Sequence, residues 1–136
     1  MNHEILENFI ADLIERSLKD KHLKEEITFP IPLKTIDKAW KNHFIDLREY
    51  TCKIHSDEIR HIYKEHQEDV YLISKILYYL ETCMKIEKSS TRDRQTGKDL
   101  PCLVFTKHSS TTKIKIVKVH LSRNKILSLK TLYEVS

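Results

Sequence analysis

Apolar residues recur at intervals of three and four along the first 20 positions of the chain. This spacing places them on one side of a helix, so it predicts an amphipathic helix over Leu6–Leu18. Pro30 and Pro32 then break the pattern, because proline is disfavoured inside helices and in inner strands. We therefore expect Ile27–Leu33 to be an extended connector or a sheet edge, and Asp37–Leu47 to form a second helix.

The middle of the chain predicts one short strand followed by two helices. Tyr50–Ile54 has the alternation that is typical of a strand. Ser56 precedes two acidic residues, which is the composition of a helix N-cap and first turn, so we expect a helix to start there. Asp69–Thr82 carries its apolar residues on one helical face and predicts a further helix.

The pattern changes at Met84, after which apolar and polar residues alternate. Met84–Lys88 predicts a short strand, and the polar segment after it contains Gly97, the only glycine of the chain. Three longer strands are expected next, over Cys102–His108, Lys113–Leu121 and Lys125–Val135. The order of these elements predicts an α+β fold in which N-terminal helices pack on one face of a C-terminal four-stranded antiparallel sheet.

The length of 136 residues suits one domain, which we expect to comprise a helical extension over 1–50 and a core over 51–136. Apolar residues make up 40% and charged residues 32%, which is typical of a globular protein rather than a disordered one. No apolar run is long enough to cross a bilayer, and the start lacks the features of a secretion signal. We therefore expect a cytoplasmic protein that does not act on membranes.

Several classes of chemistry are disfavoured by missing motifs. Cys52, Cys83 and Cys102 are widely spaced and form no C-x-x-C pair, so we expect buried thiols rather than disulfides or a zinc site. With a single glycine the chain has no Gly-rich phosphate loop, and it has no G-x-S-x-G elbow. We expect neither a metal nor a cofactor.

The net charge of +4 is concentrated in the second half of the chain. Between Lys85 and Lys130 there are 12 basic residues and three acidic ones. A sheet with this charge could bind a phosphate backbone, or its lysines could simply protect solvated strands from aggregation. Charge alone does not separate the two interpretations.

Histidines and strand residues are the remaining candidates for chemistry. His61 and His66 are five residues apart, which places them on different helical faces. His66 shares the apolar face of its helix and would ordinarily be a core residue, whereas His61 is expected at the surface. The candidates in the strands are Arg92, Arg94, Lys107, Lys118, His120, Thr131 and Tyr133. Each is also an ordinary strand residue, so the functional case depends on their joint occurrence.

One segment resembles a known family. Ser56–His66, which reads SDEIRHIYKEH, is similar to the H-I-x-x-x-H helix of phage-associated nucleases in the barnase–EndoU–colicin–RelE-like group. The likeness continues through Arg92 or Arg94 and a basic strand pair to a last strand with Thr131 and an aromatic residue, and it covers about 54–135. Gln67 departs from the family pattern, in which a small residue, often glycine, tends to follow the second histidine.

The resemblance implies an endoribonuclease toxin that needs neither metal nor cofactor. Its substrate would be RNA, with transfer RNA among the candidates, and its partner an immunity or antitoxin protein. The ribose 2′-oxygen would attack the adjacent phosphorus, with His66 as general acid or base and His61 as a second catalytic candidate. Arg92, with Arg94 in reserve, would hold the phosphate, and Thr131 would bind a phosphate oxygen. Substrate binding would fall to Lys107, Lys118, His120 and Tyr133, the last by stacking on a base.

Two alternatives remain open from the sequence. The first is a nucleic-acid-binding module without catalysis, which would use the same cations. The second is an accessory or antitoxin-like protein that docks on a partner through Leu6–Leu18 and Phe29–Trp40.

Overall fold

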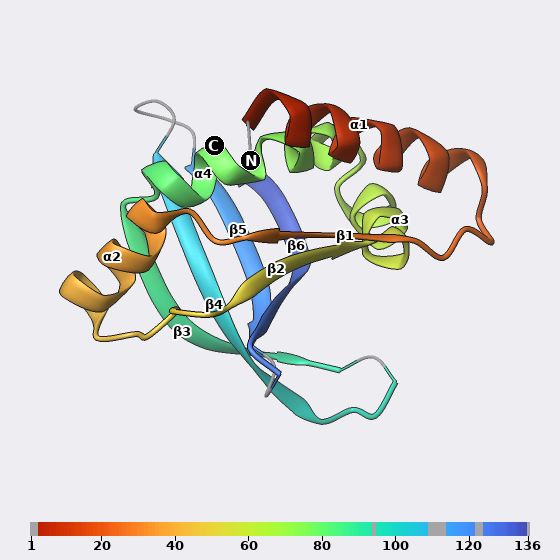
Figure 1. The fold of residues 1–136 in the computed structure, drawn as a ribbon. Coiled ribbons are helices and arrows are strands. Elements are labelled where there is room, and N and C mark those ends of the chain that lie inside the picture. Colours follow the sequence, from red (N-terminus) through yellow and green to blue (C-terminus); the bar gives the residue numbers. More distant parts are fainter. Residues whose placement is uncertain (1–2, 94, 109–113, 122–123, 136) are drawn as a thin grey trace.

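The structure is a computed structural model in which helices and curved strands alternate in the first half of the chain (Figure 1). The helical elements are α1 (His3–Lys19), α2 (Leu33–His43), α3 (Ser56–Glu65), the 3-10 helix η1 (Gln67–Lys75) and α4 (Ile76–Thr82). The strands are β1 (Glu26–Pro30), β2 (Thr51–His55), β3 (Lys85–Arg92), β4 (Asp99–His108), β5 (Ile114–Leu121) and β6 (Ile126–Val135). The structure describes residues 3–93, 95–108, 114–121 and 124–135, and within β5 only the backbone of 114–116, 118, 120 and 121.

The strands form a six-stranded sheet in the order β1-β2-β6-β5-β4-β3. β3 to β6 follow one another as an antiparallel meander, as the sequence predicts. The predicted four-stranded sheet is nevertheless wrong, because β2 adds to β6 in parallel and β1 adds to β2. β1 ends at Pro30 and lies at the sheet edge, where the missing N–H of proline leaves no inner hydrogen bond unmade. The α+β class and the edge position of this segment are confirmed.

The helix starts and helix types differ from the predictions in two places. The N-cap of α3 is His55, whose Nδ1 accepts a hydrogen bond from the Asp57 N–H at 3.0 Å. Ser56 is instead buried, and its hydroxyl donates to the Leu23 carbonyl at 2.7 Å. The predicted helix over Asp69–Thr82 is divided, since η1 is a 3-10 helix and only Ile76–Thr82 is α-helical.

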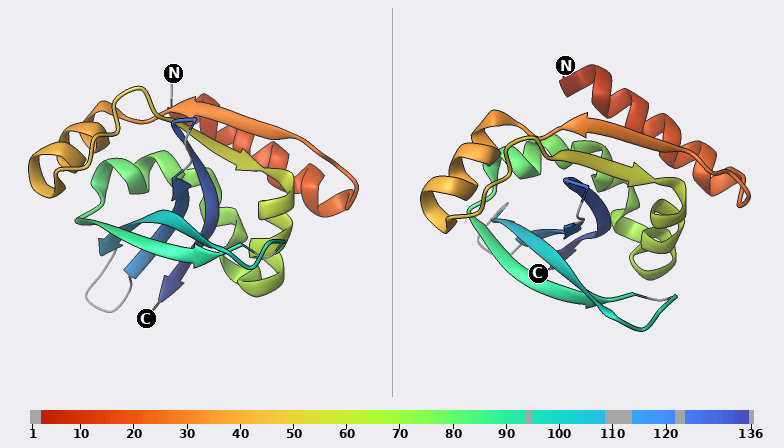
Figure 2. Two further views of the ribbon diagram at one scale, coloured as in Figure 1. Left: turned by 90° about the horizontal axis from the view of Figure 1, so that it is seen from below. Right: turned by 60° about the horizontal axis from the view of Figure 1, so that its bottom comes forward.

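One face of the sheet is buried under helices. α3 and η1 contact β6, α4 contacts β4 and β5, and α1 packs against η1 and α3 (Figures 1 and 2). The core rows of the meander run through the register, for example Ile86, Phe105, Val117 and Leu132. Residues of α1 and β1, such as Leu6 and Phe29, belong to the same buried cluster.

The three cysteines are buried, as expected, and are not linked by disulfides. Burial raises the pKa of the Cys52 thiol to about 12. A buried, protonated thiol is a poor nucleophile, so Cys52 behaves as a small apolar side chain.

Candidate functional site

A pocket of about 460 Å³ lies between α3, β6 and the far end of β3. It is lined by Glu58, His61, Glu65, His66, Thr91, Arg92, Lys130, Thr131 and Tyr133, and we call it the α3–β6 pocket. The four residues that the sequence nominated as catalytic, His61, His66, Arg92 and Thr131, all line it. The structure therefore brings together side chains from α3, from the residue that follows it, from β3 and from β6, which span the 71 residues from 61 to 131.

One wall of the α3–β6 pocket is a polar stripe on α3. Glu58, His61 and Glu65 are three and four residues apart, so they share a helical face. The Nε2 atom of His61 lies 3.3 Å from a Glu65 carboxylate oxygen, and the His61 side chain is only 24% exposed. His61 therefore faces the pocket, and its predicted place at the open surface is corrected.

His66 stands at the end of α3, where the backbone leaves helical geometry. Its φ is −138° and its ψ is 59°, so the helical spacing rule that separated it from His61 does not apply. Its N–H donates to the Ile62 carbonyl at 2.7 Å, and its carbonyl accepts from the Asp69 N–H at 2.9 Å. These two bonds hold the backbone on both sides of Gln67, the position where the chain departs from the family pattern.

The His66 ring is stacked on Tyr133. Their centroids are 4.6 Å apart and their planes are inclined by 11°. The Glu134 N–H also donates to an Asp69 carboxylate oxygen at 3.2 Å, which ties β6 to η1 beside this stack. Tyr133 thus supports the imidazole of His66. The face of the Tyr133 ring that contacts His66 is therefore not available to stack on a base.

The wall formed by β6 contains a β-bulge. Lys118 is opposite Thr131, whereas the next residue, Val119, is opposite Leu129, so Lys130 is the extra residue. In a regular strand neighbouring side chains point to opposite faces, but the bulge brings both Lys130 and Thr131 to the pocket. Lys130 Nζ lies 3.6 Å from a Glu58 carboxylate oxygen. Thr131 Oγ1 is buried and has no hydrogen-bond partner among the described residues.

Arg92 is the last residue of β3, and it lines the pocket together with Thr91. The end of β3 and the start of β4 bend toward α3 (Figure 2). The turn that follows is held by Asp93, whose N–H donates to the Lys98 carbonyl at 2.7 Å. The Gln95 N–H, bonded to the Asp93 carboxylate, lowers its pKa, with smaller contributions from Thr96 and Lys130. Gly97, at φ 72°, takes the left-handed conformation that this turn needs.

Of the remaining predicted substrate-binding residues, only Lys107 has a described side chain, and it does not line the α3–β6 pocket. Lys107 lines a different pocket, between α1 and α4. Lys118 and His120 lie in β5, paired in register with Thr131 and Ser128, but their side chains lie outside the described part of the chain. Arg94 lies outside the described residues altogether.

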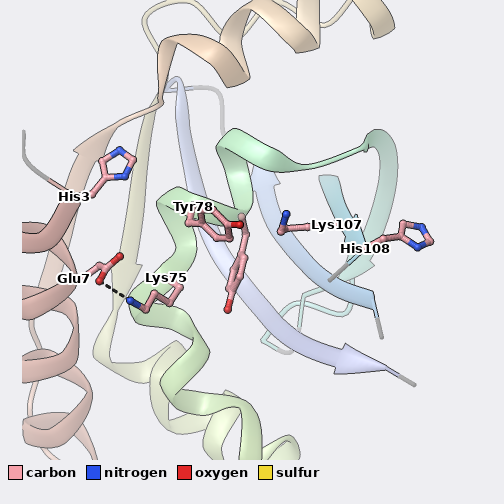
Figure 3. A pocket seen from close by; sticks show the side chains of 7 residues that line it. His3, Glu7, Lys75, Tyr78, Lys107 and His108 are labelled. Carbon is pink, nitrogen blue, oxygen red and sulfur yellow. Dashed lines mark hydrogen bonds and ion pairs between the residues drawn. The ribbon is translucent and has the colours of Figure 1, made fainter. Parts of the chain in front are cut away.

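A second pocket of about 510 Å³ lies where the start of α1 meets α4 and the end of β4. It is lined by His3, Glu7, Lys75, Tyr78, Tyr79, Lys107 and His108, and we call it the α1–α4 pocket (Figure 3). Lys75 pairs with Glu7 at 2.8 Å, and His3 lies 2.8 Å from a Glu81 oxygen. Lys107 Nζ stands 4.8 Å from the centre of the Tyr78 ring. Three of its basic side chains are thus engaged within the protein.

Four residues of the pocket, Glu58, Glu65, Thr91 and Lys130, are not among the functional candidates that the sequence nominates. Glu58 and Glu65 could have been found, because they lie three residues before and four after His61 on the same helix. Lys130 could not, since it reaches the pocket only through the bulge in β6. In a regular strand the side chains of Lys130 and Thr131 would point to opposite faces of the sheet.

The comparisons with known proteins return no match for this chain, whether with family models, curated proteins or solved structures. In the part of the chain that the structure describes, no three His, Cys, Asp or Glu side chains are grouped so that they could hold a metal ion. No helix of the described residues is long and apolar enough to cross a membrane.

Proposed function

We propose that this chain is a metal-independent endoribonuclease of the toxin type, similar to the barnase–EndoU–colicin–RelE-like group. The observation that carries the proposal is that His61, His66, Arg92 and Thr131 line one pocket. Two imidazoles, a guanidinium and a hydroxyl are a sufficient set for phosphodiester transesterification.

In the proposed reaction the ribose 2′-oxygen bonds to phosphorus while the bond from phosphorus to the 5′-oxygen breaks. The products are a 2′,3′-cyclic phosphate and a free 5′-hydroxyl. One imidazole accepts the 2′-hydroxyl proton, and the other donates a proton to the departing 5′-oxygen. Histidine suits both roles because its neutral and protonated forms are both accessible near neutral pH.

The surrounding side chains would hold the imidazoles and the phosphate. Glu65 is placed to orient the His61 ring at 3.3 Å, and Tyr133 supports the His66 ring by stacking. Arg92 has no ion pair among the described residues, so its charge is available for a phosphate. The Thr131 hydroxyl, buried without a partner in the described part, would donate to a phosphate oxygen.

The test is cleavage of total cellular RNA in excess EDTA. The wild-type chain should leave 2′,3′-cyclic phosphate ends, and RNA methylated at every 2′-oxygen should stay intact. His66→Ala should lose the activity, whereas His22→Ala, in the turn after α1, should keep it. RNA binding without any cleavage by the wild type would contradict the enzyme and favour the non-catalytic binding module.

A further inference from the structure

We infer that the RNA strand extends along α3 beyond the cleavage site, and that Lys53, His55 and Ser128 bind a second phosphate of the same strand. The inference rests on the proposed function, because it takes the α3–β6 pocket to hold the scissile phosphate.

The geometric basis is a second hollow next to the α3–β6 pocket. It has a volume of about 320 Å³ and is lined by Lys53, His55, Asp57, Glu58, Ser128, Leu129 and Lys130. Glu58 and Lys130 also line the α3–β6 pocket, so the two hollows adjoin across this ion pair. Together they form a groove that follows α3 from its first residues to its end. The strand β2 leads directly into this helix (Figure 1).

The length of this groove suits more than one nucleotide. α3 has 10 residues. At roughly 1.5 Å of rise per residue, this helix is about 15 Å long. Successive phosphates of a stacked strand are about 3.4 Å apart along its axis, so roughly four nucleotides would lie beside α3. A strand with its scissile phosphate near His61 and His66 would therefore bring a neighbouring phosphate to the start of α3.

The residues at the start of α3 present hydrogen-bond donors for that phosphate. His55 Nδ1 accepts a hydrogen bond from the Asp57 N–H at 3.0 Å, so a neutral His55 carries its own hydrogen on Nε2. Lys53 and Ser128 are register partners on the adjacent parallel strands β2 and β6, which places their side chains on one face of the sheet. An ammonium group, an imidazole N–H and a hydroxyl thus line the same hollow.

The two carboxylates in this hollow are already engaged by other cations. Asp57 accepts from Lys24 Nζ at 2.7 Å and from an Arg60 nitrogen at 2.6 Å, and Glu58 pairs with Lys130 at 3.6 Å. Lys53 is half-buried and, among the described residues, has no ion pair. The positive charge of Lys53 is therefore the one that the hollow leaves uncompensated, which favours an anionic ligand.

The experiment uses chimeric oligonucleotides with one ribonucleotide in an otherwise deoxyribose strand, so that the cleaved bond is known. A dinucleotide is compared with strands extended by three nucleotides on the 5′ side or on the 3′ side. Lys53→Ala should raise KM for one of the extended strands about tenfold and leave kcat/KM for the dinucleotide unchanged. Lys53→Arg should restore KM. Lys64→Ala, an exposed lysine of α3 outside the groove, is the matched control for charge.

Binding of a fully 2′-O-methylated strand separates this inference from the proposed function, because that strand cannot be cleaved. Each phosphate contact contributes about 0.7 to the slope of log Kd against log salt for single strands, so Lys53→Ala should lower the slope by about that amount. Lys53-dependent binding without cleavage would retain the groove and contradict the enzyme. Cleavage with equal KM in Lys53→Ala and Lys64→Ala would overturn the second phosphate site.

Discussion

The α3–β6 pocket and the α1–α4 pocket have similar contents but different internal contacts. Both contain histidine, lysine, glutamate and tyrosine, and their volumes are about 460 and 510 Å³. In the α1–α4 pocket, Lys75 pairs with Glu7 (Figure 3). His3 contacts Glu81, and Lys107 stands over the Tyr78 ring. In the α3–β6 pocket, the Arg92 charge and the Thr131 hydroxyl have no partner among the described residues.

This difference indicates which of the two pockets is set up for a ligand. A polar group that is buried without a partner costs about 1–3 kcal/mol, and a ligand that supplies the partner removes this cost. Side chains that already pair within the protein offer no such gain, since a ligand must first displace their partners. Residue composition therefore does not distinguish the pockets, whereas the buried Thr131 hydroxyl without a partner among the described residues does.

The largest expected effect comes from removing the imidazoles. His61→Ala and His66→Ala should each lower kcat for RNA cleavage by about 10²–10⁴-fold, because each removes one proton-transfer group. The double variant should be little worse than either single variant, since the two groups act as a unit. His108→Ala, in the α1–α4 pocket, should leave kcat unchanged, as steady-state kinetics on a defined oligonucleotide would show. A tenfold loss of kcat in His108→Ala would show that the α1–α4 pocket also takes part in cleavage.

The next effect concerns the cations of the two pockets. Arg92→Ala should lower kcat by about 10²–10³-fold, which is the usual loss when one group that stabilises developing negative charge is removed. Lys107→Ala should change kcat less than twofold, because Lys107 stands over Tyr78 in the other pocket. Circular dichroism and thermal unfolding of both variants would exclude loss of fold as the cause. Equal losses in the two variants would mean that RNA contacts both pockets.

Thr131→Val should separate stability from activity. Valine has nearly the shape of threonine and lacks the buried hydroxyl, so the free energy of unfolding should rise by about 1 kcal/mol. Cleavage should nevertheless fall about tenfold, because a single hydrogen bond to a phosphate oxygen is lost, at about 1.4 kcal/mol per factor of ten. Denaturant unfolding and single-turnover kinetics measure the two quantities. A destabilised Thr131→Val protein would show that the hydroxyl is satisfied in the folded state.

The smallest effect concerns Tyr79 of the α1–α4 pocket and the free energy of unfolding at alkaline pH. Burial, with smaller effects of Glu134 and other neighbours, raises the pKa of Tyr79 from 10 to about 12. The folded state therefore favours the protonated phenol, so this contribution to stability is complete below pH 10 and is lost as the pH rises from 10 to 12. Tyr79→Phe should weaken the fall in the free energy of unfolding over this range. An identical fall in wild type and variant would refute the assignment.

Local sequence was enough to predict most of the helices and strands, but it predicted fewer of the pairings between strands. Apolar spacing identified the first helix and all four strands of the meander, because helical and strand periodicities are encoded in neighbouring residues. It did not indicate that Thr51–His55 pairs in parallel with Ile126–Val135. This pairing depends on which edge strand of the meander is accessible to Thr51–His55. The tertiary structure determines this, and the local sequence does not.

The candidate site was likewise determined partly by the sequence and partly by the tertiary structure. The sequence by itself nominated His61, His66, Arg92 and Thr131 through residue type and a short motif, and these side chains share a pocket. Only the tertiary structure decided how they meet. The backbone leaves the helix at His66, the β3–β4 hairpin bends back toward α3, and the bulge at Lys130 turns two neighbouring side chains to one side. Each of these is a departure from regular geometry, held by long-range packing and hydrogen bonds, and sequence periodicity describes only the regular part.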